Sequence, residues 1–264
     1  MFQHILVAHD LSVEADFALQ RAHLLAIQTG AQLSIVHINN GAKPQAVILH
    51  TLQEKYQTLI GDLSNIHIIN GEIATHINLI AKELPADLLV LGQHHSSSSE
   101  HFGGHTLEQL LQSSFIPILL VAKHPPQCWS HAIAALDFSA AANHAAQLTG
   151  RLLAESGHLK AVHVHEVTPA HTSADLQDEF NFHQSLFEIL CADIQKELPN
   201  RSIHFEPHWL IGERHYCLQQ FIKKHPPTLL ALGVHTRNAL STVLIGSIIS
   251  EWLNYSAFDI LLTH

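Results

Sequence analysis

The chain has 264 residues, a formal net charge of −10, 47% hydrophobic residues and only 14% charged residues. This composition is typical of globular domains and excludes a disordered chain, and the length suits two compact domains. The charge is spread evenly, without a basic patch, which excludes nucleic acid as the main partner.

Membrane and secreted classes are also disfavoured. Apolar runs stop at about eight residues, which is too short to span a bilayer. The first residues show no basic segment before an apolar core, so we expect no secretory signal. The three cysteines, Cys128, Cys191 and Cys217, have no paired spacing. We therefore expect a cytoplasmic protein with no membrane segment and no disulfide framework.

Short apolar runs alternate with helical patterns along the first half of the chain. Residues 4–9 form an apolar run that stops at Asp10, and 13–29 show helical spacing closed by Gly30. The same alternation predicts further strands over 33–39, 66–69, 87–91 and 117–122, and further helices over 47–63, 73–84 and 105–114. Alternation of this kind predicts a parallel sheet with helices on both faces.

The second half repeats this plan after a rigid linker, His124-Pro125-Pro126-Gln127. Its helices lie between strands expected near 132–136, 160–166, 202–209, 228–232 and 258–262. We therefore expect an α/β chain of two tandem Rossmann-like (flavodoxin-like) domains, residues 1–124 and 129–264, each with a five-stranded parallel sheet. Residues 168–197 form a longer second helical region than the first half has.

The two halves also resemble one another in sequence. Residues 4–12 and 131–139 each run from apolar residues to Asp, an apolar residue and Ser. Three later segments match in the same order: 35–38 with 161–164, 70–72 with 211–213, and 89–92 with 230–233. Self-similarity at this spacing means that one module is used twice.

The candidate ligand-binding residues lie at the carboxyl ends of predicted strands, where open parallel sheets bind ligands. Asp10 and Asp137 follow the first strands, and Gly92 and Gly233 end the fourth strands. Each aspartate could instead cap the helix that follows, and each glycine could be a plain turn residue.

A glycine pattern follows the fourth strand of the second half. Gly233 is followed after two residues by Thr236 and, nine residues later, by Gly246 and Ser247. Glycine lets a phosphate approach the backbone, and a helix N-terminus offers free N–H groups. The pattern predicts a phosphate loop without a Walker lysine.

On these motifs the chain resembles the universal stress protein family over nearly its whole length, as a tandem pair of domains. The family's ATP-binding members carry Gly-x2-Gly-x9-Gly-Ser/Thr, which Gly233, Gly246 and Ser247 match, with Thr236 at the middle glycine. The resemblance implies ATP as the ligand of the second domain and assigns the ribose- and adenine-facing roles to Asp137 and Val164. The full implied site comprises Asp137, Val164, Gly233, Thr236, Arg237, Gly246, Ser247 and Ile248.

The first half departs further from the family pattern. His95 stands at the middle glycine, and the run Gly104-His105-Thr106 comes one residue early. The corresponding site there comprises Asp10, Ile38, Gly92, Gly104, His105 and Thr106. This loop could be degenerate, or could bind another anion.

Histidine is unusually frequent, with 25 residues. Four of them, His94, His95, His101 and His105, are candidate metal ligands, but a solvated Ser-rich loop is the favoured interpretation and we expect no metal. His163 and His165 share one face of a predicted strand, where we expect them to be packed and hydrogen-bonded. The histidine content also predicts an acid-sensitive transition near pH 6.

The expected function is therefore that of a stress-response protein that binds a nucleotide and has no catalytic residues. Any ATP hydrolysis would be slow and incidental. In the family, pairing often runs through the fifth strands, here 117–122 and 258–262, which implies an internal pseudo-dimer and allows a homodimer. The alternative is a scaffold, or a pH- or metal-responsive interaction protein, whose loops have drifted from nucleotide binding.

Overall fold

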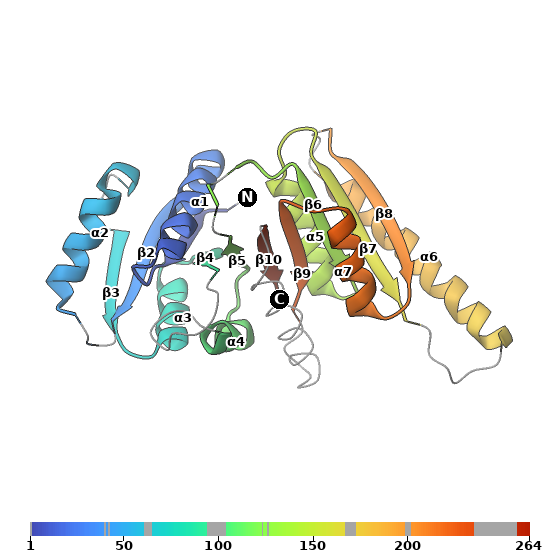
Figure 1. Ribbon diagram of the computed structural model, residues 1–264, viewed down its shortest axis with the longest axis horizontal. Coiled ribbons are helices and arrows are strands. Elements are labelled where there is room, and N and C mark those ends of the chain that lie inside the picture. The colour runs from blue at the N-terminus through green and yellow to red at the C-terminus, as the bar shows by residue number, and fades with distance from the viewer. Residues whose placement is uncertain are drawn as a thin grey trace. The chain divides into compact units, whose positions relative to one another are not determined.

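The computed structural model describes residues 2–39, 41, 43–60, 65–93, 104–122, 124–125, 127–166, 173–198, 202–234 and 258–264. These residues form two compact units (Figure 1). The first unit comprises the described residues of 2–127 with Phe258 and Asp259, and the second comprises those of 128–234 with 260–264. No helix in these ranges is long and apolar enough to cross a membrane.

The first unit is built on five strands in the order β3-β2-β1-β4-β5, with every neighbouring pair parallel. The strands β1 and β4 are buried along their whole length, which explains their unbroken apolar sequences. The strands are β1 (His4–Ala8), β2 (Gln32–Asn39), β3 (Ile66–Asn70), β4 (Leu88–Gly92) and β5 (Ile118–Val121), and the helices are α1 (Val13–Thr29), α2 (Gln45–Ile60), α3 (Ile73–Glu83) and α4 (Gly104–Ser113).

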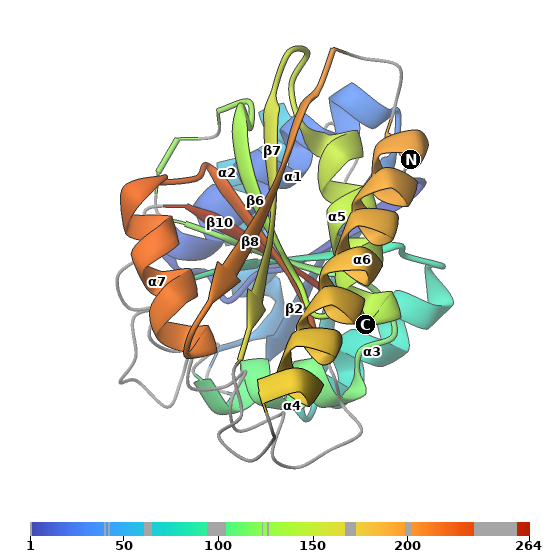
Figure 2. The same cartoon turned by 90° about the vertical axis from the view of Figure 1, so that its right-hand side faces the viewer.

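The second unit repeats this topology in the order β10-β9-β6-β7-β8. Figure 2 shows α5 and α6 on one side of its strands and α7 on the other. The strands are β6 (His131–Leu136), β7 (His158–His165), β8 (His204–Ile211), β9 (Leu229–Gly233) and β10 (Asp259–Thr263), and the helices are α5 (Ala140–Leu152), α6 (Ser173–Glu197) and α7 (Arg214–Lys224). The expected α/β fold with parallel sheets is confirmed.

The repeated Gly-Glu pairs of the sequence are helix caps. The Glu72 carboxylate accepts backbone N–H groups at the start of α3, and Glu213 does the same at the start of α7. Gly71 and Gly212 precede them with φ of 151° and 143°, a region that favours glycine. The Thr75 side chain, followed by these N–H groups, holds the pKa of Glu72 below its ordinary value, and the N–H groups do so for Glu213. This part of the repeat serves the fold.

The first unit also contains a buried ion pair between residues far apart in the chain. Arg21 of α1 lies 3.0 Å from the Asp259 carboxylate, and both side chains are almost completely buried. Asp259 also accepts the Ala122 N–H at 2.9 Å, and Arg21 donates to the Gln127 carbonyl. A buried charge is tolerated only when it is paired in this way.

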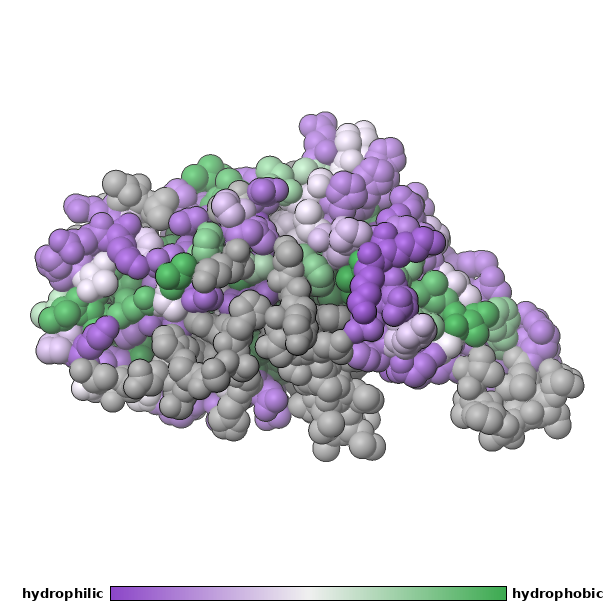
Figure 3. All heavy atoms as spheres, in the orientation of Figure 1, coloured by the Kyte–Doolittle hydropathy of each residue, from purple (hydrophilic) through white to green (hydrophobic). Residues whose placement is uncertain are grey.

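One helix leaves apolar side chains on the surface. Figure 3 shows apolar surface beside the lower end of α6. Phe182 and Ile189 of this helix are 60% and 59% exposed. The opposite side of α6 buries Phe187, Cys191 and Ile194 against the unit, and burial raises the pKa of the Cys191 thiol to about 12, so this cysteine is unreactive.

Candidate functional site

In each unit the strand order reverses next to the first strand. β6 pairs with β7 on one side and with β9 on the other, and β1 likewise pairs with β2 and β4. The carboxyl end of that first strand is therefore the switch point at which open α/β sheets bind ligands. Asp137 and Asp10 stand directly after it.

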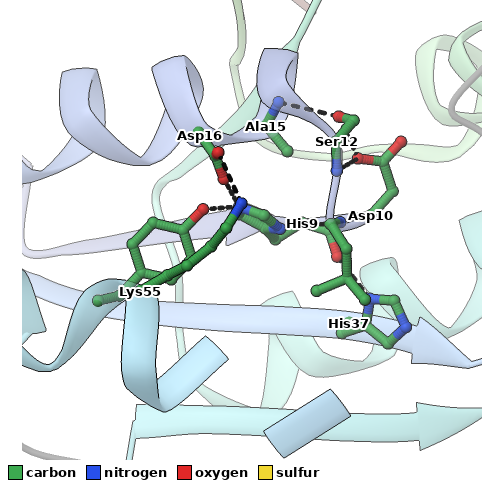
Figure 4. A network of polar contacts seen from close by, with 9 residues as sticks. His9, Asp10, Ser12, Ala15, Asp16, His37 and Lys55 are labelled. Atoms are coloured by element: carbon green, nitrogen blue, oxygen red, sulfur yellow. Dashed lines mark hydrogen bonds and ion pairs between the residues drawn. The ribbon is translucent and has the colours of Figure 1, made fainter. Parts of the chain in front are cut away.

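Both aspartates are held in the same turn. Asp10 accepts hydrogen bonds from the Ser12 N–H and hydroxyl, and Asp137 accepts the same two bonds from Ser139. Each serine hydroxyl in turn accepts a backbone N–H of the first helical turn, at 3.1 Å in α1 and 3.0 Å in α5. Figure 4 shows this arrangement in the first unit. The serine is the helix cap, and the aspartate orients it.

The residue inside this turn adopts a left-handed backbone in both units. Leu11 has φ of 70° and Phe138 has φ of 65°, a conformation that is rare and costly for side chains of this size. The repeat therefore preserves a strained loop geometry while the side chain changes from Leu to Phe.

The remaining predicted contacts of the second unit lie at the ends of adjacent strands. Val164 is buried near the end of β7, and Gly233 ends β9. Since β7 and β9 flank β6, the structure brings Asp137, Val164 and Gly233 to one edge of the sheet. In the first unit Asp10, Ile38 and Gly92 are brought together in the same way.

The two strand-end glycines are required by helix packing. A Cβ on Gly92 would lie 2.5 Å from the Glu14 backbone carbon, and one on Gly233 would lie 2.4 Å from the Ala142 backbone nitrogen. The close neighbour of each glycine is therefore the first turn of α1 or α5. This packing explains both glycines without a bound phosphate.

The glycine loops themselves fall largely outside the described residues. Gly104 begins α4 and Thr106 is half-buried within it. Within the described part of the chain, no three His, Cys, Asp or Glu side chains are arranged to hold a metal ion. The predicted residues outside the described ranges are Thr236, Arg237, Gly246, Ser247 and Ile248 of the nucleotide loop and the metal candidates His94, His95 and His101, and the side chain of His105 is likewise not described.

A buried histidine on the second strand supports the switch point in both units. The His37 Nδ1 donates to the His9 carbonyl at 2.7 Å, and the His163 Nδ1 donates to the Leu136 carbonyl at 2.7 Å. Burial lowers the pKa of both imidazoles. The repeated Val-His pair in the sequence is the signal for this contact, and its role as a brace between the first two strands emerges only from the structure.

Beside this brace the first unit carries a polar network (Figure 4). The Leu11 N–H donates to His9 Nδ1, so the neutral ring bears its proton on Nε2. That nitrogen lies 2.8 Å from the Tyr56 hydroxyl and 3.2 Å from the Asp16 carboxylate, which also pairs with Lys55 at 2.9 Å. Burial alone would raise the pKa of Asp16, but the hydrogen bonds from His9 and Lys55 outweigh it and hold the pKa low.

The second unit has aromatic rings in place of this network. His163 contacts the rings of Phe138 and Trp209, with centroids 4.4 and 4.8 Å away. His165 stacks on Trp209 at 5.4 Å and lies 5.5 Å from His183 of α6. We call this group the ring cluster: Phe138, His163, His165, Phe180, His183, Phe187 and Trp209. It joins α6 to β7 and β8 beside the switch point.

Comparison with known proteins identifies the fold and the family. Residues 1–122 and 129–264 each match the model of the Universal stress protein family. Universal stress protein G of Salmonella typhimurium is 23% identical over 126 residues, which cover 40% of this chain and 88% of that protein. A universal stress protein from Archaeoglobus fulgidus has a similar structure, with a TM-score of 0.65 at 15% identity, covering 98% of this chain and 95% of its own. A putative universal stress protein from Pseudomonas aeruginosa gives a TM-score of 0.63 at 16% identity, covering 99% and 93% of the two chains.

Proposed function

The chain belongs to the universal stress protein family, and on this premise we propose that it is a cytoplasmic stress-response protein that binds a nucleotide, ATP or a close relative, in its second domain. The proposed domains are 1–124 and 129–264, paired within the chain as a pseudo-dimer, and two chains can associate further. The proposal includes no catalytic residue.

The observation that supports nucleotide binding most directly is the edge formed by Asp137, Val164 and Gly233. These residues lie at or next to the carboxyl ends of three adjacent strands at a switch point, with the N-terminus of α5 beside them. A carboxylate there can accept hydrogen bonds from hydroxyl or amino groups of a nucleoside. The loop from Gly233 to Ser247 supplies the phosphate contacts in this proposal.

A second candidate function is that of a scaffold without a nucleotide. The observation that favours it is the packing of Gly92 and Gly233 against helix backbones, because these glycines are then needed for the fold alone. Thr236 and His95, which replace the middle glycines of the family pattern, favour it as well.

Titration with a fluorescent ATP analogue decides between the two functions. We expect saturable binding, with one site per chain, that unlabelled ATP displaces. Asp137→Asn should weaken binding by about tenfold, because the new side chain loses the charge. Asparagine can still accept the two bonds from Ser139, so the turn should be preserved.

Asp10→Asn is the matched control, because it makes the same change in the equivalent turn of the first unit. We expect it to leave the affinity of the second domain unchanged. Absence of binding at millimolar nucleotide would replace the nucleotide proposal with the scaffold. Equal loss of affinity in the two variants would place the ligand elsewhere than at Asp137.

A further inference from the structure

The ring cluster attaches the first half of α6 to the sheet. Phe180 of α6 packs edge-on against Trp209 and His165 of the sheet, with centroids 5.8 and 5.4 Å away. One and two turns further along, His183 contacts His165, and Phe187 contacts Trp209 at 5.5 Å. These contacts recur at helical spacing, so they hold one face of α6 over about two turns.

Three members of this cluster can become charged. His163 is buried, and His165 and His183 are half-buried among aromatic rings. A charged imidazolium loses hydration when apolar groups enclose it, a cost that a neutral ring avoids. Proton uptake by the cluster therefore opposes the packing that holds the helix.

The charges around His163 act in the same direction. Burial is the largest influence that lowers its pKa, and the charges of His165, Arg214 and His183 lower it further. Arg214, at the start of α7, is itself paired with Glu166, which follows β7, at 2.8 Å. The hydrogen bond from His163 to the Leu136 carbonyl is the opposing influence, and burial outweighs it.

We propose that the ring cluster is an acid-sensitive latch, in which protonation of His163, His165 and His183 releases the first half of α6 from β7 and β8. The released state is the one in which Trp209 and the imidazoles are hydrated. This latch does not depend on nucleotide binding.

The direction of the pH effect follows from proton linkage. The pKa of His163 in the packed state lies below its ordinary value of 6.5. The open state, in which the ring is hydrated, therefore binds more protons than the closed state as the pH falls below about 6.5. The latch is closed above that value and progressively opens below it.

Two other sites in the chain allow an effect of this latch to be distinguished from a general effect of the many histidines. In the first unit, Asn39 occupies the position equivalent to His165, next to the equivalent brace of His37. At the other end of the second sheet, His131, His158 and His204 are in register on β6, β7 and β8, and stack at 5.3 and 4.7 Å. This second group is exposed or half-exposed, and the Glu206 carboxylate lies 3.5 Å from His158.

Hydrogen–deuterium exchange on the full-length chain tests the proposal. Peptides that cover residues 177–190 are followed at about pH 7.5 and about pH 5.5, with rates corrected for intrinsic exchange. In the wild type we expect α6 to lose protection by about tenfold or more at the lower pH. In His165→Asn with His183→Gln, that ratio should fall to about twofold. His204→Gln, which changes the exposed group, should behave as the wild type.

Each outcome decides for or against the latch. Protection of α6 that is the same at both pH values in the wild type overturns it, and so does an unchanged pH response in the double variant. Loss of protection throughout the second unit at once also overturns it, because that result means global unfolding. If the double variant does not fold, His183→Gln alone carries the test, since His183 lies half-buried on the helix, and a wild-type response in that variant overturns the proposal.

Discussion

The two units share one brace and differ in what surrounds it. In both, a histidine on the second strand donates to the carbonyl that precedes the switch-point aspartate. In the first unit the next contacts are polar, through His9, Tyr56, Asp16 and Lys55. In the second, Leu136 and Asn143 stand in the places of His9 and Asp16, and the ring cluster takes over.

This difference separates what the fold requires from what each copy has acquired. The Asp–Ser turn, the strand-end glycine, the glutamate cap and the histidine brace occur twice. The polar network and the ring cluster occur once each, and both involve the second helix of their unit. The two copies therefore share the plan of the sheet and differ in the contacts that this helix makes with it.

The largest effect is expected from the buried ion pair, which the second unit does not repeat: the position equivalent to Arg21 is Leu148. Asp259→Asn leaves the Arg21 guanidinium buried without its carboxylate. It should lower the free energy of unfolding by about 4 kcal/mol, measured by urea titration. Asp193→Asn, which changes an exposed pair with Lys196, is the control and should cost less than about 1 kcal/mol.

The strand-end glycines should behave alike in the two units. Gly92→Ala and Gly233→Ala each force a methyl group against helix backbone, and each should cost about 3 kcal/mol. Gly30→Ala has open space around it and only a left-handed backbone to accommodate, so it should cost about 1 kcal/mol. Thermal unfolding of the three variants measures these costs. A harmless Gly233→Ala would contradict the packing explanation for that glycine.

Converting the first unit toward the second tests the polar network. His9→Leu places the residue of the second unit in the first and leaves the Tyr56 hydroxyl and the Asp16 carboxylate without the ring nitrogen. It should cost about 2 kcal/mol. Adding Tyr56→Phe removes one of these two polar groups and should recover about 1 kcal/mol of that loss. A double variant no more stable than His9→Leu alone would show that the tyrosine hydroxyl finds another partner.

The smallest effect is expected from the two serine caps. Ser12→Ala and Ser139→Ala each remove one acceptor for a helix N–H and one donor to the neighbouring aspartate. Each substitution should lower the free energy of unfolding by about 1 kcal/mol, and the two losses should be nearly equal. Chemical denaturation of both variants gives the comparison, and a cost confined to one unit would mean that the turns are not equivalent in energy.

Much of the fold was predictable from the sequence because its signals are local. The buried strands β1 and β4 are unbroken apolar runs in the sequence, and Gly30 closes α1 as expected. The repeat located the switch point, since Asp10 and Asp137 stand at the same place in each copy. The packing of His163 and His165 on one face was also expected, and both lie in the ring cluster.

What the sequence did not predict depends on residues far apart in the chain. Nothing near Arg21 indicates that its partner is Asp259, and nothing near His165 indicates that Phe180 and His183 of α6 reach it. The sequence predicts phosphate-facing glycines because their close neighbour in the structure, the first turn of the first helix of each unit, is far away in the chain and has no local signature. A residue type such as glycine can serve several roles, and tertiary contacts of this kind decide which role it has.

The left-handed residue between aspartate and serine gives the two switch-point loops the same backbone path, so that one loop could replace the other. Leu11 and Phe138 share one backbone conformation and the same flanking hydrogen bonds. A chimera that carries residues 137–139 in place of 10–12 would thus transplant an aromatic ring into the first copy without redesigning its main chain. Because of the duplication, the loop of the first unit has a backbone that can accept the residues of the equivalent loop in the second unit.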